Sequence, residues 1–201
     1  MKKYIITISR EFGCNAREIG RSLASRLGVP FYDKDLVDLA AEKAGVHRDI
    51  IKESDEVMNK KQNRLFDEFG YGSSTSFFSE KAINAQAEVI REVADRKEAC
   101  IMFGRCSDYI LREYPNILNF FLYAPVDWKI KHIAGTYELT EKNAEKMIKR
   151  IDKQRHNYYK YVTGKNRGDR SGKHVMLDVS VYGVEGSVEL LTEAVWIRFS
   201  E

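Results

Sequence analysis

An apolar segment near the start of the sequence runs into a polar loop and then into a helix-period pattern. Residues Ile5–Ile8 are rich in β-branched side chains, and such a nearly continuous apolar run is typical of a strand buried in a parallel sheet. Ile19, Leu23 and Leu27 then recur every four residues, which predicts a helix. Strand, loop and helix in this order place backbone N–H groups and the positive end of a helix dipole at the loop, where an anion can bind.

The loop departs from the phosphate-loop pattern Gly-x-x-x-x-Gly-Lys-Ser/Thr. When Gly13 is taken as the turn glycine, Arg10 stands at the first glycine, Asn15 at the second and Ala16 at the lysine. Asn15 tolerates a left-handed conformation. Arg10 or Arg17 can supply the missing charge, since a guanidinium holds two phosphate oxygens at once. A phosphate-binding loop and an ordinary strand–helix turn with exposed arginines both stay open at this point.

The composition is that of a globular protein. The 201 residues, 43% hydrophobic and 31% charged, fit a single domain over 1–201 that carries a small insert. No apolar run approaches the ~20 residues of a membrane span. The apolar segment that follows Met1-Lys2-Lys3 is too short for a signal peptide. We therefore expect a cytoplasmic protein without a membrane partner. The 3 cysteines include no Cys-x-x-Cys pair and indicate reduced thiols rather than a metal site.

Positive charge is concentrated in one segment. Residues 142–173 contain eleven Lys and Arg against three acids, although the net charge of the whole chain is only +3. Such a segment is expected to meet a polyanion, either a nucleotide phosphate or a nucleic acid. Few aromatic residues are interleaved with these charges before Tyr158 and no nucleic-acid motif is present, which counts against RNA binding.

Short apolar segments alternate with helical patterns along the rest of the chain. Strands are expected at 29–33, 99–103, 118–123 and 175–181, and helices at 35–43, 78–97, 126–136, 140–162 and 184–199. This alternation predicts an α/β fold with a parallel core sheet flanked by helices. Residues 46–76 are polar and end in glycines and serines, so we expect an insert with a binding loop there.

The helix at 140–162 carries much of the basic segment. Thr140 is expected to be its N-cap. Its apolar face is expected to consist of Ala144, Met147, Ile151, Tyr158 and Val162, with Arg150 and Arg155 mostly off that face. The two arginines are then either part of a solvated face or ligands of an anion. Asp33 lies at the carboxyl end of the strand at 29–33. It can either cap the following helix or contact a ligand, and both interpretations stay open.

Five segments taken in order resemble the cytidylate kinase-like family. They are Ile6–Gly13, Pro30–Lys34, Gly104-Arg105, Arg155–Gly164 and Leu177–Ser180. The resemblance implies a three-layer fold like that of the P-loop kinases, with a monophosphate-binding insert at about 46–76 and a basic helical lid at about 140–173. It also implies transfer of the γ-phosphoryl group of ATP, with Mg²⁺, to CMP, dCMP or a similar nucleoside monophosphate.

The resemblance assigns roles to individual residues. Arg105 matches an arginine that holds the acceptor phosphate, whereas Cys106 replaces the acid that follows this arginine in the family. Asp152 and Arg155 match an Asp-x-x-Arg motif of the lid. This match implies that Asp152 contacts the substrate and that Arg155 contacts the phosphates, with Arg150 as a second lid cation.

We therefore predict the following site. The ATP phosphates are held by Arg10, Gly13, Cys14, Asn15, Ala16, Arg17 and Glu18. The acceptor is held by Asp33, Arg105, Asp152 and Arg155, and the charge of the transferred group is stabilised by Arg17, Arg150 and Arg155. No side chain is predicted as a direct metal ligand, because Mg²⁺ is expected to be held through phosphate oxygens and water. Two other classes stay open: a nucleotide-binding regulator without transfer, and an RNA-binding protein that uses the basic segment.

Overall fold

The computed structural model describes residues 3–33, 36, 39, 43, 80–96 and 98–200. The chain divides into two compact units, Met1–Phe31 with Lys97–Glu201 and Tyr32–Arg96. We call them the larger and the smaller unit. The insert expected at 46–76 lies outside the described residues, and the single domain over 1–201 stays a prediction.

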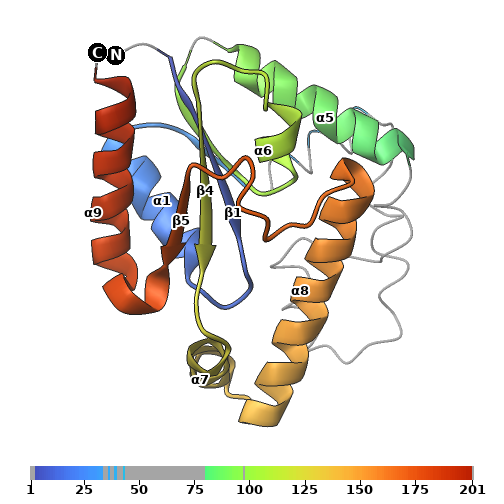
Figure 1. Ribbon diagram of the computed structural model, residues 1–201, viewed down its shortest axis with the longest axis vertical. Helices are drawn as coiled ribbons and strands as arrows, with labels where there is room; N and C mark the ends of the chain where they lie inside the picture. The colour runs from blue at the N-terminus through green and yellow to red at the C-terminus, as the bar shows by residue number, and fades with distance from the viewer. Residues whose placement is uncertain are drawn as a thin grey trace. The chain divides into compact units, whose positions relative to one another are not determined.

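A five-stranded sheet forms the centre of the larger unit (Figure 1). Its strands are β1 (Ile5–Arg10), β2 (Phe31–Tyr32), β3 (Cys100–Phe103), β4 (Ile117–Tyr123) and β5 (Val175–Asp178), in the order β2-β3-β1-β4-β5. β1 pairs in parallel with β3 and β4, and β4 pairs in parallel with β5. The predicted α/β fold with a parallel core sheet is confirmed, and this order places the carboxyl ends of β1 and β3 side by side.

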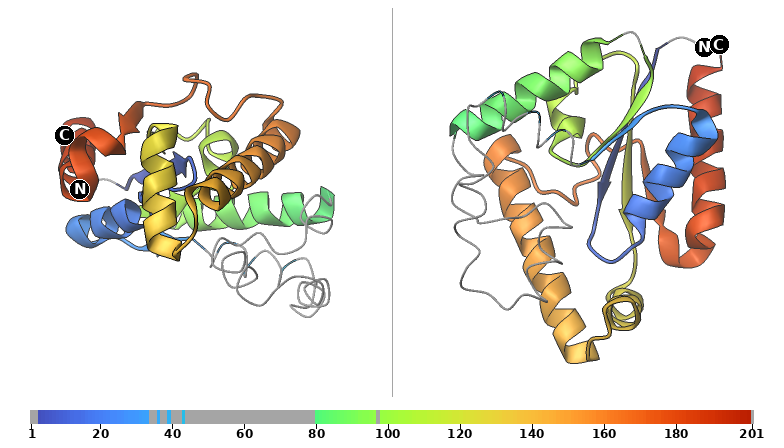
Figure 2. Two further views of the ribbon diagram at one scale, coloured as in Figure 1. Left: turned by 90° about the horizontal axis from the view of Figure 1, so that it is seen from below. Right: turned by 180° about the vertical axis from the view of Figure 1, so that it is seen from behind.

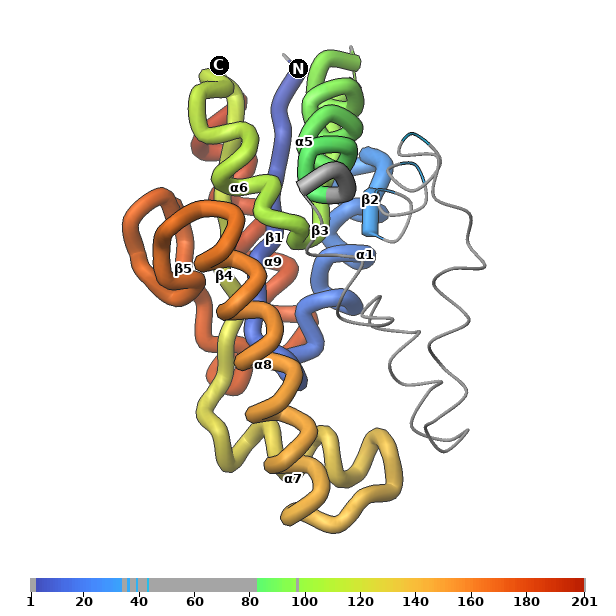
Figure 3. Tube along the Cα trace, turned by 90° about the vertical axis from the view of Figure 1, so that its right-hand side faces the viewer, coloured from blue at the N-terminus to red at the C-terminus, as the bar shows by residue number. Residues whose placement is uncertain are grey.

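Helices cover both faces of this sheet. α1 (Ala16–Leu27) and α9 (Val179–Phe199) lie side by side on one face, whereas α6 (Ser107–Ile110) and α8 (Glu141–Thr163) lie on the other (Figure 2). α7 (Val126–Tyr137) packs against α8 beyond the carboxyl end of β4 (Figure 3). In the described part of the chain, no helix combines the length and the apolar character that crossing a bilayer requires.

The two faces of the sheet differ in chemistry because successive side chains of a strand point to opposite faces. Ile8 of β1 is fully buried with Leu23 of α1 and Leu191 of α9 in one apolar core. Thr7, the residue before Ile8, faces the other way, and its hydroxyl donates a hydrogen bond of 2.7 Å to Oδ1 of Asn119 in β4. The face toward α6 and α8 therefore holds buried polar groups.

The smaller unit contains one long described helix, α5 (Glu80–Asp95). Its buried side chains include Val89, Ile90 and Val93. Val93 follows Val89 by four residues and Ile90 by three, as expected for one face of a helix. Of the helix expected at 35–43, positions 36, 39 and 43 are described and all three are helical. The expected start of α5 at Phe78 lies outside the described residues.

The last strand is three residues shorter than the sequence predicts. β5 ends at Asp178, and α9 begins at Val179 because the Asp178 carboxylate caps the helix. Its Oδ1 accepts hydrogen bonds from the backbone N of Ser180 at 3.0 Å and from the Ser180 hydroxyl at 2.7 Å. This cap outweighs the strand preference of the valines on either side of Ser180. Gly183, with φ of 65°, then interrupts the helix, and the predicted start at Val184 marks its second part.

Candidate functional site

Two arginine side chains meet at one aromatic ring where the carboxyl ends of β1 and β3 adjoin. Cζ of Arg10, the last residue of β1, lies 4.0 Å from the centroid of the Phe103 ring at the end of β3. Cζ of Arg17, in the first turn of α1, lies 5.8 Å from the same centroid. Because the face of an aromatic ring attracts cations, Phe103 holds both guanidiniums in one place. The structure thus brings together the two arginines that were predicted to replace the phosphate-loop lysine.

The turn that follows β3 has an unusual backbone. Gly104, Arg105 and Cys106 have φ values of 76°, 59° and 56°, and such left-handed values are unfavourable for residues with a Cβ atom. Arg10 also approaches Gly104 closely, so that an added Cβ would lie 1.9 Å from Nη1 of Arg10. Strained backbone of this kind is concentrated at functional sites. The turn places the half-buried Arg105 directly after the residue that contacts Arg10.

The loop between β1 and α1 also depends on left-handed residues. φ is 86° at Gly13 and 53° at Asn15, so Asn15 adopts the conformation expected of it. A Cβ atom on Gly13 would lie 2.9 Å from Cγ1 of Ile133, and glycine is therefore required both for its φ and for the close approach to α7. Asn15 leads into α1, whose first-turn N–H groups have no intrahelical partners. In that turn Ala16 is buried and Glu18 is exposed.

Cys14 holds this loop in place rather than supplying a reactive thiol. Its buried Sγ donates hydrogen bonds to the carbonyl oxygens of Glu11 at 3.3 Å and Leu122 at 3.4 Å. Burial raises the pKa of Cys14 to about 11. A thiol with this pKa stays protonated near neutral pH and is a poor nucleophile.

Asp152 of α8 joins the predicted lid to the loop. Its Oδ1 accepts hydrogen bonds from the backbone N of Phe12 at 2.9 Å and from Nη2 of Arg167 at 2.8 Å. Nη1 of Arg167 also donates to the carbonyl oxygen of Arg10 at 2.8 Å. The structure therefore places Asp152 against the loop, and its contact with an acceptor substrate stays a prediction.

A buried lysine of α7 lies beside the same carboxylate. Lys129 is 3% exposed, and its Nζ lies 2.6 Å from Oε2 of Glu11 and 3.6 Å from Oδ2 of Asp152. A buried ammonium group is costly unless it is paired, and these two carboxylates compensate it. Lys129 and Arg167 were not predicted from the sequence. Arg167 belongs to the basic segment already noted, whereas Lys129 stands in no motif and only the fold brings it to the loop.

The two predicted lid arginines occupy different positions. Arg155 is 6% exposed, and its Cζ lies 5.6 Å from the centroid of the Phe12 ring. It therefore lies at the loop, as a phosphate ligand would. Arg150 is half-buried, and burial lowers its pKa from the ordinary value. Their contacts with phosphate stay predictions.

The buried face of α8 differs from the expected one. It includes Ile151, Arg155 and Tyr159, which follow one another at intervals of four residues. The apolar pattern of the sequence placed Tyr158 on this face and Arg155 mostly off it. That placement was wrong, because it followed apolar character and ignored that a buried arginine and a hydrogen-bonded tyrosine can continue the stripe.

A second buried charge cluster lies on the polar face of the sheet, and it was not predicted from the sequence. Oδ2 of Asp108 accepts hydrogen bonds from the hydroxyl of Tyr159 at 3.0 Å and from Nζ of Lys173. The side chains of Asp108 and Lys173 are 3% and 1% exposed. Burial, assisted by the neighbouring Asp108 carboxylate, raises the pKa of Tyr159 above its ordinary value. The cluster ties α6, α8 and the segment before β5 together.

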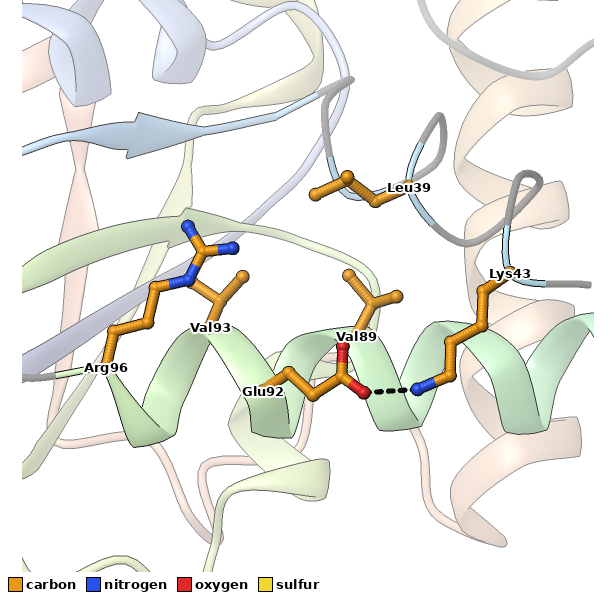
Figure 4. Close-up of a pocket in the computed structure, with 6 residues that line it drawn as sticks. All are labelled: Leu39, Lys43, Val89, Glu92, Val93 and Arg96. Carbon is orange, nitrogen blue, oxygen red and sulfur yellow. Dashed lines mark hydrogen bonds and ion pairs between the residues drawn. The ribbon is translucent and has the colours of Figure 1, made fainter.

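The smaller unit has a pocket of its own (Figure 4). It has a volume of about 220 Å³ and is lined by Leu39, Lys43, Val89, Glu92, Val93 and Arg96. Lys43 forms an ion pair with Glu92, and Nη1 of Arg96 donates a hydrogen bond of 3.1 Å to the hydroxyl of Tyr32. Asp33, the predicted acceptor contact, is buried in this unit directly after β2.

The model of the cytidylate kinase-like family matches residues 5–181. This chain belongs to the cytidylate kinase-like family. The matched range begins at β1 and ends in α9, so it contains the loop, the turn after β3 and the whole of α8. The resemblance seen in five short segments is thereby confirmed. No curated protein matches the chain.

Solved structures similar to this cytidylate kinase-like protein include two kinases and a protein described as uncharacterized. An uncharacterized protein from Eubacterium ventriosum ATCC 27560 is 25% identical, with a TM-score of 0.74 over 98% of this chain and 100% of that chain. A shikimate kinase from Bacteroides thetaiotaomicron is 15% identical, with a TM-score of 0.55 over 96% and 98%. A gluconokinase from Sinorhizobium meliloti 1021 is 14% identical, with a TM-score of 0.52 over 98% and 97%. At these identities the two kinases show the fold alone, which is that of P-loop kinases.

The donor set around the loop fits a polyphosphate. Arg10 and Arg17 lie together at Phe103, and Arg155 lies at Phe12, so three guanidiniums surround the loop. Arginine forks match phosphate oxygens in geometry and charge. Within the described ranges, no three His, Cys, Asp or Glu side chains are grouped so that they could hold a metal ion. The arginine side chains and the backbone N–H groups at the loop are suited in charge and geometry to an anion.

Proposed function

We propose that this chain is an ATP-dependent nucleoside monophosphate kinase whose acceptor is CMP or dCMP. The observation that carries the proposal is the convergence of Arg10 and Arg17 on Phe103, beside the turn that carries Arg105. Phosphoryl transfer depends on positioning and on neutralising charge more than on covalent chemistry. Guanidiniums at the carboxyl ends of parallel strands, where α/β proteins bind ligands, can supply both.

The loop is the proposed site of the ATP phosphates. The N–H groups of the loop and of the first turn of α1 bind phosphate oxygens, with Arg10 and Arg17 in place of the missing lysine. Gly13 and Cys14 fix the path of the backbone between Arg10 and Arg17. When bound, Mg²⁺ neutralises charge on the phosphate oxygens. No side chain is proposed as its direct ligand.

The acceptor phosphate is proposed to bind Arg105, with Asp33 and Asp152 as further substrate contacts. Arg150 and Arg155 cover the transferring group from α8 and stabilise the charge that develops on it. Closure of such a lid also excludes water, which would otherwise compete with the acceptor. The position of Arg155 at the Phe12 ring supports this role, because it places a buried cation at the loop.

Two observations favour a second candidate, a nucleotide-binding regulator that does not transfer phosphate. The loop contains no lysine, and the N–H of Phe12 is already bonded to Asp152. RNA binding has less support. Arg155, Arg167 and Lys173 of the basic segment point toward a ring or a carboxylate of the protein itself, so fewer cations remain for an RNA backbone.

A coupled assay of ADP release from ATP and Mg²⁺ separates these functions. The acceptors are CMP, dCMP, UMP, AMP and GMP, with shikimate and gluconate included because the fold neighbours act on them. The proposal predicts acceptor-dependent ADP release with CMP or dCMP. A regulator would show a rise in melting temperature with ATP by mass action but no ADP release with any acceptor. Activity with shikimate or gluconate alone would assign a different acceptor class.

A further inference from the structure

We propose that Lys129 and Arg167 are phosphate-binding cations of the loop, and that in the free protein the Asp152 carboxylate occupies the place of a nucleotide phosphate. This inference rests on the proposed function, since the phosphate that displaces Asp152 belongs to a nucleoside triphosphate. It adds two binding residues and gives Asp152 a role in the free protein, in addition to the substrate contact proposed above. The carboxylate and the phosphate exclude each other at one set of donors.

The contacts of Asp152 are those of a bound anion. The backbone N of Phe12 lies 2.9 Å from Oδ1, Nη2 of Arg167 lies 2.8 Å from it, and Nζ of Lys129 lies 3.6 Å from Oδ2. A backbone N–H from a strand–helix loop together with two cations is the donor set by which such loops bind phosphate. In this protein that donor set converges on a carboxylate supplied by α8.

Within the cluster of Glu11, Asp152, Lys129 and Arg167, the charges are balanced only while Asp152 is present. Glu11 and Asp152 face Lys129 and Arg167, so two carboxylates compensate two cations. When Asp152 leaves, the two cations face one carboxylate, and Glu11 stays with Lys129 at 2.6 Å. The excess positive charge then lies beside the Phe12 N–H. Because Lys129 is only 4% exposed, water screens its charge weakly, and the site attracts a phosphate.

Asp152 is more accessible than the two cations that it contacts. Its side chain is 20% exposed, against 4% for Lys129 and 12% for Arg167, whereas Glu11, which is 30% exposed, is paired with Lys129 at 2.6 Å. The loop also lies against Lys129, because a Cβ on Gly13 would be only 3.5 Å from Cβ of Lys129. The cation is therefore fixed under the loop, and the acid has access to solvent. A phosphate carries more charge and more acceptor oxygens than a carboxylate, so it is the stronger ligand for these donors.

If Asp152 competes with a phosphate, removing Asp152 should raise the affinity for phosphate, and removing Lys129 or Arg167 should lower it. A charge cluster with a purely structural role does not predict these opposite effects. The experiment is isothermal titration calorimetry of the full chain with inorganic tripolyphosphate, without Mg²⁺. Asp152→Ala removes the competitor, and a self-occupied fraction of about nine-tenths would make this variant bind about 10-fold more tightly. Lys129→Met and Arg167→Met each remove a charged donor and should weaken binding by about 10-fold or more. Lys129→Arg should retain more affinity than Lys129→Met.

Matched controls exist for each variant. Glu145→Gln removes an acid of α8 that pairs only locally with Lys149. Lys131→Met and Arg170→Met remove exposed cations of α7 and of the segment after α8. All three controls should bind tripolyphosphate like the parent. Melting temperatures of the variants identify any that fail to fold, and Arg167→Met keeps the test valid if Lys129→Met unfolds, because Arg167 is only half-buried.

The outcomes separate this inference from the proposed function. Equal or weaker binding by Asp152→Ala, in a folded protein, overturns the exchange even if ADP release is normal. Unchanged binding by both Lys129→Met and Arg167→Met overturns it as well. Tighter binding by Asp152→Ala together with absent ADP release supports the exchange and contradicts the kinase. If neither the parent nor Asp152→Ala binds tripolyphosphate or ATP, both the exchange and the proposed kinase function are overturned.

Discussion

The guanidinium of Arg10 lies 4.0 Å from the ring centroid of Phe103 and reaches this place across Gly104. No side chain could stand at position 104 without displacing it, since a Cβ there would lie 1.9 Å from Nη1 of Arg10. The backbone after β3 is therefore fitted to an arginine that projects from the end of β1. This fit connects the unusual turn to the candidate phosphate site.

Gly104→Ala should weaken ATP binding, because the added Cβ would displace Arg10. The substitution introduces a steric clash with Arg10 and a left-handed alanine, which alone costs about 1–2 kcal/mol. We expect a lower melting temperature and a KM for ATP raised by about 10-fold, the size of one lost charged hydrogen bond. Gly164→Ala is the matched control, since φ is 71° there and nothing lies within 4 Å of the added Cβ. If Gly104→Ala and Gly164→Ala show the same KM for ATP, Arg10 has no part in nucleotide binding.

Arg105 is expected to determine the use of the acceptor rather than of ATP. Arg105→Ala should raise the KM for the acceptor or lower kcat/KM by at least about 10-fold, as expected for a lost charged contact, while ATP still raises the melting temperature. Arg105→Lys should restore little, because a point charge cannot replace a planar fork. The two variants keep the same left-handed backbone, so their comparison isolates the guanidinium. Unchanged kinetics of Arg105→Ala would show that this side chain does not contact the acceptor.

The elements that could be predicted from the sequence are those encoded by neighbouring residues. The repeat of Ile19, Leu23 and Leu27 determines α1, and Gly13 and Asn15 determine the path of the loop before it. Lys129 could not be found this way, because its partner Glu11 lies 118 positions earlier and only the sheet order brings α7 to the loop. A contact over this separation leaves no periodic signal.

The errors have equally local causes. The end of β5 was misplaced because Asp178 forms a helix cap that competes with the strand preference of its neighbours. The buried face of α8 was misplaced because Arg155 is buried there. In both cases a hydrogen bond or a charge contact, rather than apolar character, decided the structure. Arg10, Arg17 and Arg155 were found as candidates because their residue type matches phosphate chemistry.

Stability is predicted to fall at high pH through Tyr159. The folded-state pKa of Tyr159 lies above its ordinary value of 10.0, chiefly because the hydroxyl is buried. The unfolded chain therefore loses this proton first, and the contribution of Tyr159 is present below pH 10 and is lost as the pH rises above it. Between pH 10 and 11 the parent should lose up to about 1.4 kcal/mol more unfolding free energy than Tyr159→Phe. Tyr161→Phe, at an exposed tyrosine, should behave like the parent in urea titrations. Equal pH slopes for the parent and Tyr159→Phe would contradict this prediction.

The double variant Arg150→Ala, Arg155→Ala tests the lid. Charges that act on the transferring group should affect kcat more than ATP affinity. We expect turnover to fall by at least ~100-fold, a typical size for the loss of a preorganised charge contact, while ATP still raises the melting temperature. The double variant Lys142→Ala, Lys146→Ala removes two cations from exposed positions of the same helix and should leave turnover near that of the parent. A similar loss in both double variants would indicate a general charge effect.

The most direct test of a nucleoside monophosphate kinase is to follow both products of one reaction. The parent protein is incubated with ATP, Mg²⁺ and CMP or dCMP, and ³¹P NMR measures ADP and the nucleoside diphosphate in the same sample. Transfer predicts that CDP or dCDP forms in amounts equal to ADP, and that Arg105→Ala lowers both together. ADP without a nucleoside diphosphate, or neither product with any nucleoside monophosphate, would contradict the kinase.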